Sequence, residues 1–88
     1  MITAFKKSFL KSVQSVRDKK LRELIVQCIN EVETASAIQS VSNIKRLKGH
    51  REYYRIRLGN YRIGLKVESD VVLFVVFENR KDIYKNFP

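Results

Sequence analysis

The fold is decided by residues 53–66, which read YYRIRLGNYRIGLK. Hydrophobic and polar side chains alternate on both sides of Gly59-Asn60, a dipeptide typical of a two-residue hairpin turn. Such a turn fixes the register of its two strands. We therefore expect the cross-strand pairs Tyr53–Lys66, Tyr54–Leu65, Arg55–Gly64, Ile56–Ile63, Arg57–Arg62 and Leu58–Tyr61. Because successive side chains point to opposite faces of a sheet, one face is predicted to be apolar and the other basic.

The predicted basic face contains no acidic residue. Its members are Tyr53, Arg55, Arg57, Arg62, Gly64 and Lys66. Arg57 and Arg62 would lie directly opposite each other, and like charges so placed destabilise a hairpin by up to about 1 kcal/mol. An external anion would remove this repulsion, and the planar fork of a guanidinium suits a phosphate. Tyr53 offers a ring that could stack on a base, and Gly64 is expected to leave a gap for a backbone or sugar. This face therefore predicts a contact with single-stranded nucleic acid, the alternative being a solvated edge charged against strand pairing.

The overall charge supports a polyanionic or acidic partner. The 88 residues carry a formal net charge of +9, and the pI is near 10.0. Most of this charge lies in residues 45–66, where Glu52 is the only acidic residue. The basic residues of this segment are Lys45, Arg46, Lys48, Arg51, Arg55, Arg57, Arg62 and Lys66. A basic protein of this size usually meets nucleic acid or an acidic protein, although a merely solvated basic surface is the alternative.

The apolar spacing outside the hairpin predicts an α+β fold in one domain, residues 1–88. We expect a strand over 2–6, a helix over 8–16 capped by Ser8, and a second helix capped by Asp18. A loop over 34–43 precedes the hairpin, and a third strand over 71–77 is apolar on both faces, as in a strand buried on both sides. The expected architecture is an N-terminal strand and two helices packed on a twisted antiparallel sheet of about four strands, followed by a tail with one helical turn.

The lone cysteine, Cys28, lies in the apolar stripe of the second predicted helix. We interpret it as a core residue rather than a nucleophile, because buried free cysteines behave as small hydrophobes. One cysteine cannot form an internal disulfide, and no signal peptide or membrane span is found, so a cytoplasmic location is expected. No metal-ligand spacing is present, and no cofactor is expected.

Four motifs within residues 44–86 resemble the RelE/ParE superfamily of toxins. They are Leu47-Lys48-Gly49, the hairpin run 54–63, the apolar strand 71–76 and the run NRKDIY at 79–84. The resemblance implies the RelE-like fold and the toxin component of a bacterial or archaeal type II toxin–antitoxin system, held inactive by a cognate antitoxin. RelE-like members cut mRNA in the ribosomal A site without a metal, by making a 2′-hydroxyl attack the adjacent phosphate. ParE-like members inhibit DNA gyrase instead.

The resemblance assigns catalytic roles to Arg55, Arg57, Arg62, Arg80 and Tyr84. The arginines suit transition-state stabilisation, but arginine stays protonated in proteins and cannot act as a base. Tyr84 is the candidate base, because Arg80 and Arg62 would stabilise its phenolate. His50, the only histidine, lies outside the matched motifs and is interpreted as an exposed loop residue, with catalysis as the alternative. Glu52 is expected to pair with Arg51 or Lys66.

A second set of residues is predicted to attract the RNA backbone rather than to act in chemistry. Its members are Lys45, Arg46, Lys48, Arg51, Tyr53 and Lys66. Three functions stay open at this point: a ribosome-dependent endoribonuclease acting on mRNA, a non-enzymatic inhibitor of gyrase, and an inactive member that only binds its antitoxin.

Overall fold

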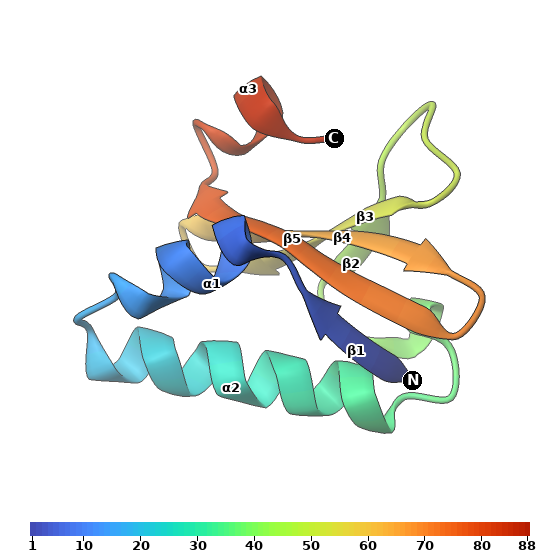
Figure 1. Ribbon diagram of the computed structural model, residues 1–88, viewed down its shortest axis with the longest axis horizontal. Coiled ribbons are helices and arrows are strands. Elements are labelled where there is room, and N and C mark those ends of the chain that lie inside the picture. The colour runs from blue at the N-terminus through green and yellow to red at the C-terminus, as the bar shows by residue number, and fades with distance from the viewer.

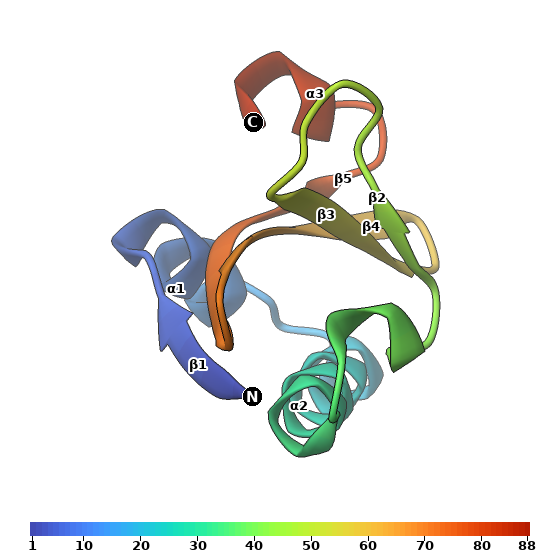
Figure 2. The ribbon, with the colours of Figure 1, turned by 90° about the vertical axis from the view of Figure 1, so that its right-hand side faces the viewer.

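In the computed structural model, which describes residues 1–88, a five-stranded sheet lies between two long helices and a short C-terminal one (Figure 1). The elements are β1 Ile2–Phe5, α1 Lys7–Gln14, α2 Lys19–Thr34, a 3₁₀ turn Ile38–Ser40, β2 Ile44–Arg46, β3 Tyr53–Leu58, β4 Tyr61–Glu68, β5 Val71–Asn79 and α3 Ile83–Asn86. Figure 2 shows α2 below the curved sheet, α1 to its left beside β1 and β5, and α3 above it. The predicted α+β architecture is confirmed.

The hairpin of β3 and β4 has the predicted register. All six expected pairs are present, from Tyr53–Lys66 to Leu58–Tyr61. Gly59 adopts a φ of +57° at the turn, a left-handed conformation that glycine adopts without steric cost. Both strands therefore place their apolar face toward the main helices, where Ile56 and Ile63 are fully buried.

The sheet differs in two details from the predicted twisted antiparallel sheet of about four strands. The strand order is β1-β5-β4-β3-β2, and β1 pairs parallel to β5, with Ile2 opposite Val71. In addition, β2 extends the sheet by pairing antiparallel with β3, and Ile44 lies opposite Ile56. The direction of a pairing between distant segments has no local sequence signal, and three residues are too few for alternation to show.

The two long helices agree largely with their prediction. Asp18 caps α2 by accepting a hydrogen bond from the backbone N–H of Leu21 at 3.2 Å, as expected. Cys28 is 6% exposed and lies in the core. Ser8, however, does not cap α1, which begins at Lys7; its hydroxyl instead donates to the Val75 carbonyl oxygen at 2.6 Å and ties α1 to β5.

Apolar side chains form two clusters, one on each side of the sheet. The larger cluster joins α1, α2 and the inner sheet face, with Phe9, Ile25, Val32, Leu65 and Phe74 at 0–1% exposure. The smaller cluster, on the outer face, consists of Val76, Ile83 and Phe87.

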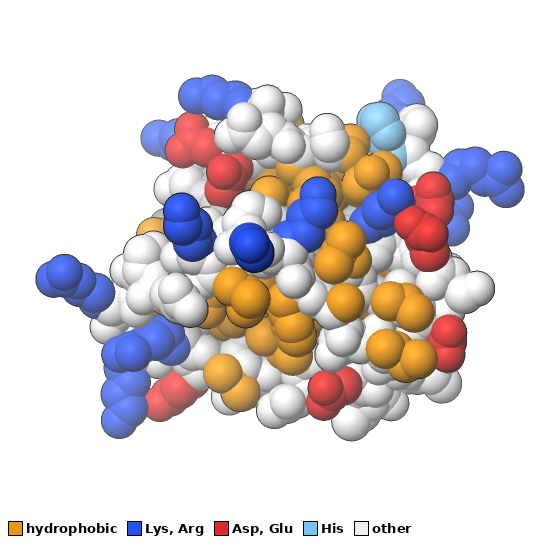
Figure 3. Space-filling view, viewed as in Figure 1, with side chains coloured by type: hydrophobic (Ala, Val, Ile, Leu, Met, Phe, Trp, Pro, Cys, Tyr) orange, Lys and Arg blue, Asp and Glu red, His pale blue; other side chains and the backbone are white.

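The outer cluster covers only the end of β5, so the prediction that this strand is buried on both sides is wrong. Val71, Leu73 and Val75 are only half-buried. Figure 3 shows apolar side chains at the surface over the centre of this view, with basic side chains around them. No helix is long and apolar enough to span a membrane.

Candidate nucleic-acid interface

The arginines of the hairpin form a row on the outer face of the sheet. Arg57 lies opposite Arg62, and Arg55 lies opposite Gly64, as predicted. Arg62 Nη1 donates to the backbone carbonyl oxygens of Gly59 at 2.8 Å and Tyr61 at 2.9 Å, which fixes its guanidinium at the hairpin turn. Arg55 Nη1 donates to the carbonyl oxygen of Asn43 at 3.2 Å.

No carboxylate forms an ion pair with this row, although Glu78 of β5 lies opposite Arg62 in the sheet. The two ion pairs of the structure, Lys66–Glu68 and Lys85–Asp82, include none of the arginines. Backbone carbonyls therefore orient the guanidiniums of Arg55 and Arg62, and neither of them forms an ion pair. Such an arrangement favours an anion supplied from outside.

The other four predicted catalytic residues are close enough to Arg62 for their charges to act on its pKa. Burial lowers the pKa of Arg62, and the positive charges of Arg55, Arg57 and Arg80 lower it further, whereas Tyr84 acts in the opposite direction. Arg80 reaches this position because its backbone N–H donates to the Asn60 carbonyl oxygen at 2.9 Å, which joins the end of β5 to the hairpin turn.

A groove of about 470 Å³ lies beside the row, between the loop that follows β2 and the C-terminal tail. Figure 2 shows this loop and α3 on the same side of the sheet. The groove joins Tyr84 and Arg55 to part of the predicted RNA-binding set. It is lined by Lys45, Arg46, Leu47, Lys48, His50, Arg55, Tyr84, Phe87 and Pro88.

His50 belongs to this groove, which the sequence did not indicate. The residue lies outside the motifs, and only the folded positions of the loop and the tail bring it near Tyr84. Its ring lies edge-on to Tyr53, with 5.9 Å between the ring centroids. This position on the groove is compatible with the alternative catalytic role of His50.

The other predicted RNA-binding residues have different environments. Arg46 donates from Nε and Nη2 to the Tyr54 hydroxyl at 3.3 and 2.9 Å, so part of its donor capacity is used within the protein. Lys66 pairs with Glu68 at 2.9 Å, and this hydrogen-bonded carboxylate raises the pKa of Lys66. Arg51 is exposed but does not line the groove. The expected pairing of Glu52 with Arg51 or Lys66 is wrong, because neither ion pair forms.

The predicted gap at Gly64 is filled by the protein itself. A Cβ on Gly64 would lie 2.8 Å from Cε1 and Cζ of Phe87 and 2.8 Å from Cγ2 of Val76. The ring of Tyr53 lies edge-on to the same Phe87, at 5.5 Å between centroids. The expectation that a sugar or backbone enters here is therefore wrong, because Phe87 comes from a tail whose position the hairpin sequence does not indicate.

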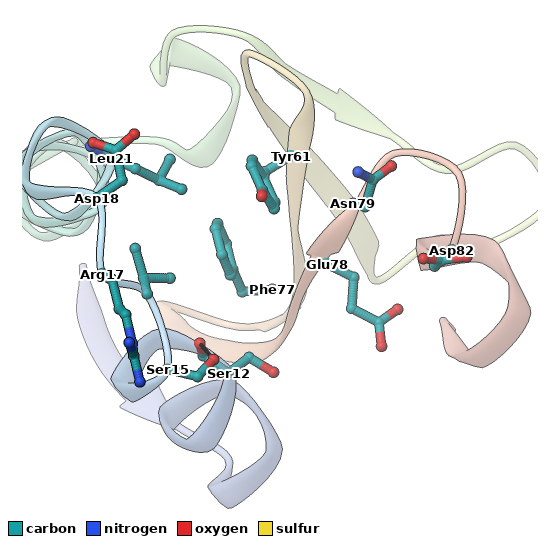
Figure 4. A pocket seen from close by; sticks show the side chains of 11 residues that line it. Ser12, Ser15, Arg17, Asp18, Leu21, Tyr61, Phe77, Glu78, Asn79 and Asp82 are labelled. Atoms are coloured by element: carbon teal, nitrogen blue, oxygen red, sulfur yellow. Dashed lines mark hydrogen bonds between the residues drawn. The ribbon is translucent and has the colours of Figure 1, made fainter.

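A second hollow, of about 590 Å³, lies between the end of α1 and the end of β5 (Figure 4). It contains none of the predicted site residues, and its charged side chains include Asp18, Glu78 and Asp82. Glu78 points away from the stacked rings of Tyr61 and Phe77, and its Oε2 is buried without a hydrogen-bond partner. Three carboxylates make this hollow unsuited to a phosphate, so the basic groove is the better candidate.

Comparison with known proteins gives close relatives over the whole chain. The chain is 38% identical over 89 residues to Toxin RelE3 of Methanocaldococcus jannaschii, covering 100% of both sequences. It is 33% identical to Putative toxin RelE1 of the same organism, over 88% of this chain and 83% of the relative. The structure resembles a chain in the crystal structure of a RelB–RelE antitoxin–toxin complex from Methanococcus jannaschii, with a TM-score of 0.80 and 38% identity over 97% of this chain and 99% of that one. No family model matches the sequence.

Proposed function

Because the chain belongs to the RelE family of toxins, we propose that it is the toxin of a type II toxin–antitoxin system that cleaves mRNA on the ribosome. In this proposal residues 1–88 act as one domain in the cytoplasm, where ribosomes and mRNA are found. The reaction is a metal-independent attack of a 2′-hydroxyl on the adjacent phosphate. Its products are a 2′,3′-cyclic phosphate and a free 5′-hydroxyl.

The arrangement of the arginines carries this proposal: Arg57 lies opposite Arg62, Arg55 lies on the same face, and Arg80 is joined to the hairpin turn. Tyr84 lines the groove together with Arg55. Phosphate attack adds negative charge to the non-bridging oxygens, and preorganised cations stabilise that charge most when they are already in place. The carbonyl oxygens of Gly59 and Tyr61 hold the Arg62 guanidinium before any substrate arrives. Arg62 is therefore proposed to contact the scissile phosphate, with Arg55, Arg57 and Arg80 around it.

The proton of the attacking 2′-hydroxyl needs an acceptor that is not an arginine. Tyr84 is 59% exposed and shares the groove with Arg55, so a ribose could approach its hydroxyl. We assign Tyr84 as the general base, because its hydroxyl lies on the groove beside Arg55 and, unlike an arginine, a tyrosine can accept a proton once it is ionised. His50 lies on the same groove and is the second candidate, either as the base or as the acid for the departing 5′-oxygen.

The basic lining of the groove supports a role in holding RNA. Lys45, Lys48 and Arg55 place positive charge beside Tyr84, and such contacts bind phosphates without reading sequence. The relative from Methanococcus jannaschii was solved as a RelB–RelE antitoxin–toxin complex. By analogy, we propose that a cognate antitoxin binds this chain and prevents its action on mRNA.

The test is cleavage of a defined mRNA on programmed ribosomes by the purified protein. We expect cleavage that leaves a 2′,3′-cyclic phosphate and is abolished by a 2′-deoxy substitution at the cleaved nucleotide. Arg62→Ala should lower the single-turnover rate by about 100-fold or more, as expected for the loss of a preorganised electrostatic contact. Arg17→Ala is the matched control, because Arg17 is an exposed arginine outside the groove. This variant should cleave the mRNA at the wild-type rate.

Two outcomes would overturn the proposal. Gyrase-dependent DNA breaks with intact mRNA would indicate a ParE-like inhibitor. Antitoxin binding without either activity would indicate an inactive member. Cleavage that survives the 2′-deoxy substitution would contradict the attack by the 2′-hydroxyl alone.

A further inference from the structure

We propose that Phe87 and Gly64 are positioning residues that place Tyr84 against the arginines. The Phe87 ring lies in a niche over Gly64, and this contact holds the C-terminal tail on the sheet. The inference rests on the proposed function, since it concerns how Tyr84 reaches its working position. It adds two residues to which the family motifs assign no role.

The tail has few other attachments to the sheet. The last hydrogen bond that joins it to another element is from the Arg80 N–H to the Asn60 carbonyl oxygen. Beyond Arg80 the hydrogen bonds are local, from Lys81 and Asp82 to Asn79 and from Lys85 to Asp82. A helix as short as α3, with four residues, has no stability of its own. The position of Tyr84 therefore depends on packing.

Two buried side chains supply that packing, one on each side of Tyr84 in the sequence. Ile83 is 0% exposed and Phe87 is 2% exposed, whereas Tyr84 between them is 59% exposed. Both buried residues belong to the small outer cluster with Val76. Phe87 also lines the groove beside Tyr84, so it is the anchor nearer to the site.

The niche exists because residue 64 is a glycine. An added Cβ would lie 2.8 Å from two ring carbons of Phe87 and 2.8 Å from Cγ2 of Val76, closer than such contacts normally come. No positive φ is involved at this position, so glycine is not needed here for its backbone conformation. Gly64, which pairs with Arg55 of β3, has no side chain, and Phe87 can therefore lie directly on β4.

We therefore expect Gly64→Ala to displace Phe87 and Tyr84 while the arginine row stays on the sheet. A misplacement of about 1 Å can lower a rate by on the order of 100-fold, so single-turnover cleavage should fall by about 10- to 100-fold. The KM should change less than about threefold, because the arginines still bind the phosphates. Gly64→Ala combined with Phe87→Leu should recover part of the rate, since leucine lacks the two ring atoms that clash and leaves only the contact with Val76 Cγ2.

A double-mutant cycle distinguishes positioning from general damage. In a Tyr84→Phe background, Gly64→Ala should lower the remaining rate less than twofold, because its effect acts through Tyr84. An equal loss in both backgrounds would overturn the proposal, as would no loss in the wild-type background. Ile25→Val, a core change in α2, is the control for stability and should leave the rate unchanged.

A measurement without RNA keeps this proposal separate from the proposed function. With ¹³C-labelled tyrosine, the Tyr84 ring signals are assigned by their absence in Tyr84→Phe. We expect them to move toward random-coil values in Gly64→Ala and Phe87→Ala while the Tyr61 signals stay in place. Unchanged Tyr84 signals in both variants would refute the positioning role, whether or not the protein cleaves mRNA.

Discussion

Because Arg57 and Arg62 lie opposite each other, we predict that removing one of the two charges stabilises the protein and lowers its affinity for RNA. Arg57→Gln is the suitable change, because the Arg57 side chain is exposed and makes no hydrogen bond or ion pair. Arg62 is unsuitable, since its guanidinium bonds to two backbone carbonyls at the turn. The substitution keeps most of the side-chain length and removes only the charge.

The size of the repulsion between Arg57 and Arg62 follows from the register of the two strands. Residues directly opposite on two strands have Cβ atoms about 5 Å apart, and two guanidiniums about 6 Å apart in a water-like dielectric repel by about 0.7 kcal/mol. For a domain of this size, that gain in the free energy of unfolding raises the Tm by about 3–6 °C. At 1 M salt the Debye length is about 3 Å, so the gain should shrink to about 0.1 kcal/mol.

Thermal melts of Arg57→Gln and wild type at 10 mM and 1 M salt measure this effect. Filter binding of a single-stranded RNA over the same salt range should give a log–log slope smaller by about 0.7, as for the loss of one phosphate contact. Arg17→Gln is the control and should change neither quantity. A destabilised Arg57→Gln protein, a Tm gain that salt does not reduce, or an unchanged RNA slope would each refute the argument.

Three further predictions concern single side chains. Tyr84→Phe should abolish most cleavage yet leave the Tm within about 2 °C, because the ring is 59% exposed; a large Tm loss in a thermal melt would contradict this. Asp18→Ala should lower the free energy of unfolding by about 1 kcal/mol through the lost cap of α2, and urea melts that show no change would contradict it. Burial, and secondarily the charge of Glu31, raises the pKa of Cys28 from 9.0 to about 12. The stability tied to this thiol is therefore complete below pH 9 and decreases as the pH rises from about 9 to 12, by on the order of 1 kcal/mol at pH 10. Urea melts at pH 8 and pH 10 should show this loss in wild type and a smaller one in Cys28→Ala; equal losses would refute it.

The parts of the fold that depend on neighbouring residues could be predicted from the sequence. Alternation around Gly59-Asn60 determines both strands of the hairpin and the face on which the arginines lie. The cap at Asp18 and the burial of Cys28 follow from helical spacing in the same way. These features need only the local period of the chain.

The parts that depend on distant contacts could not be predicted. The parallel pairing of β1, the filling of the Gly64 niche by Phe87 and the place of His50 in the groove each join segments far apart in sequence. The family resemblance gave the identities of Arg80 and Tyr84, but it gave no account of what holds them near Arg62. That account needs the hydrogen bond from Arg80 to Asn60 and the packing of Ile83 and Phe87.

The parallel pair of β1 and β5 has a consequence for the order of folding. Ile2 meets Val71, so this contact closes a loop of roughly 70 residues, and contacts of such long range form late because closing the loop costs chain entropy. The β3–β4 hairpin closes a two-residue turn and should form early, on the microsecond timescale. A nascent chain would thus carry its arginine hairpin before it had Arg80 and Tyr84, and the site would be completed only when the last strand and tail are in place. Synthesis itself would delay completion of the site until residues 80–84 have been made.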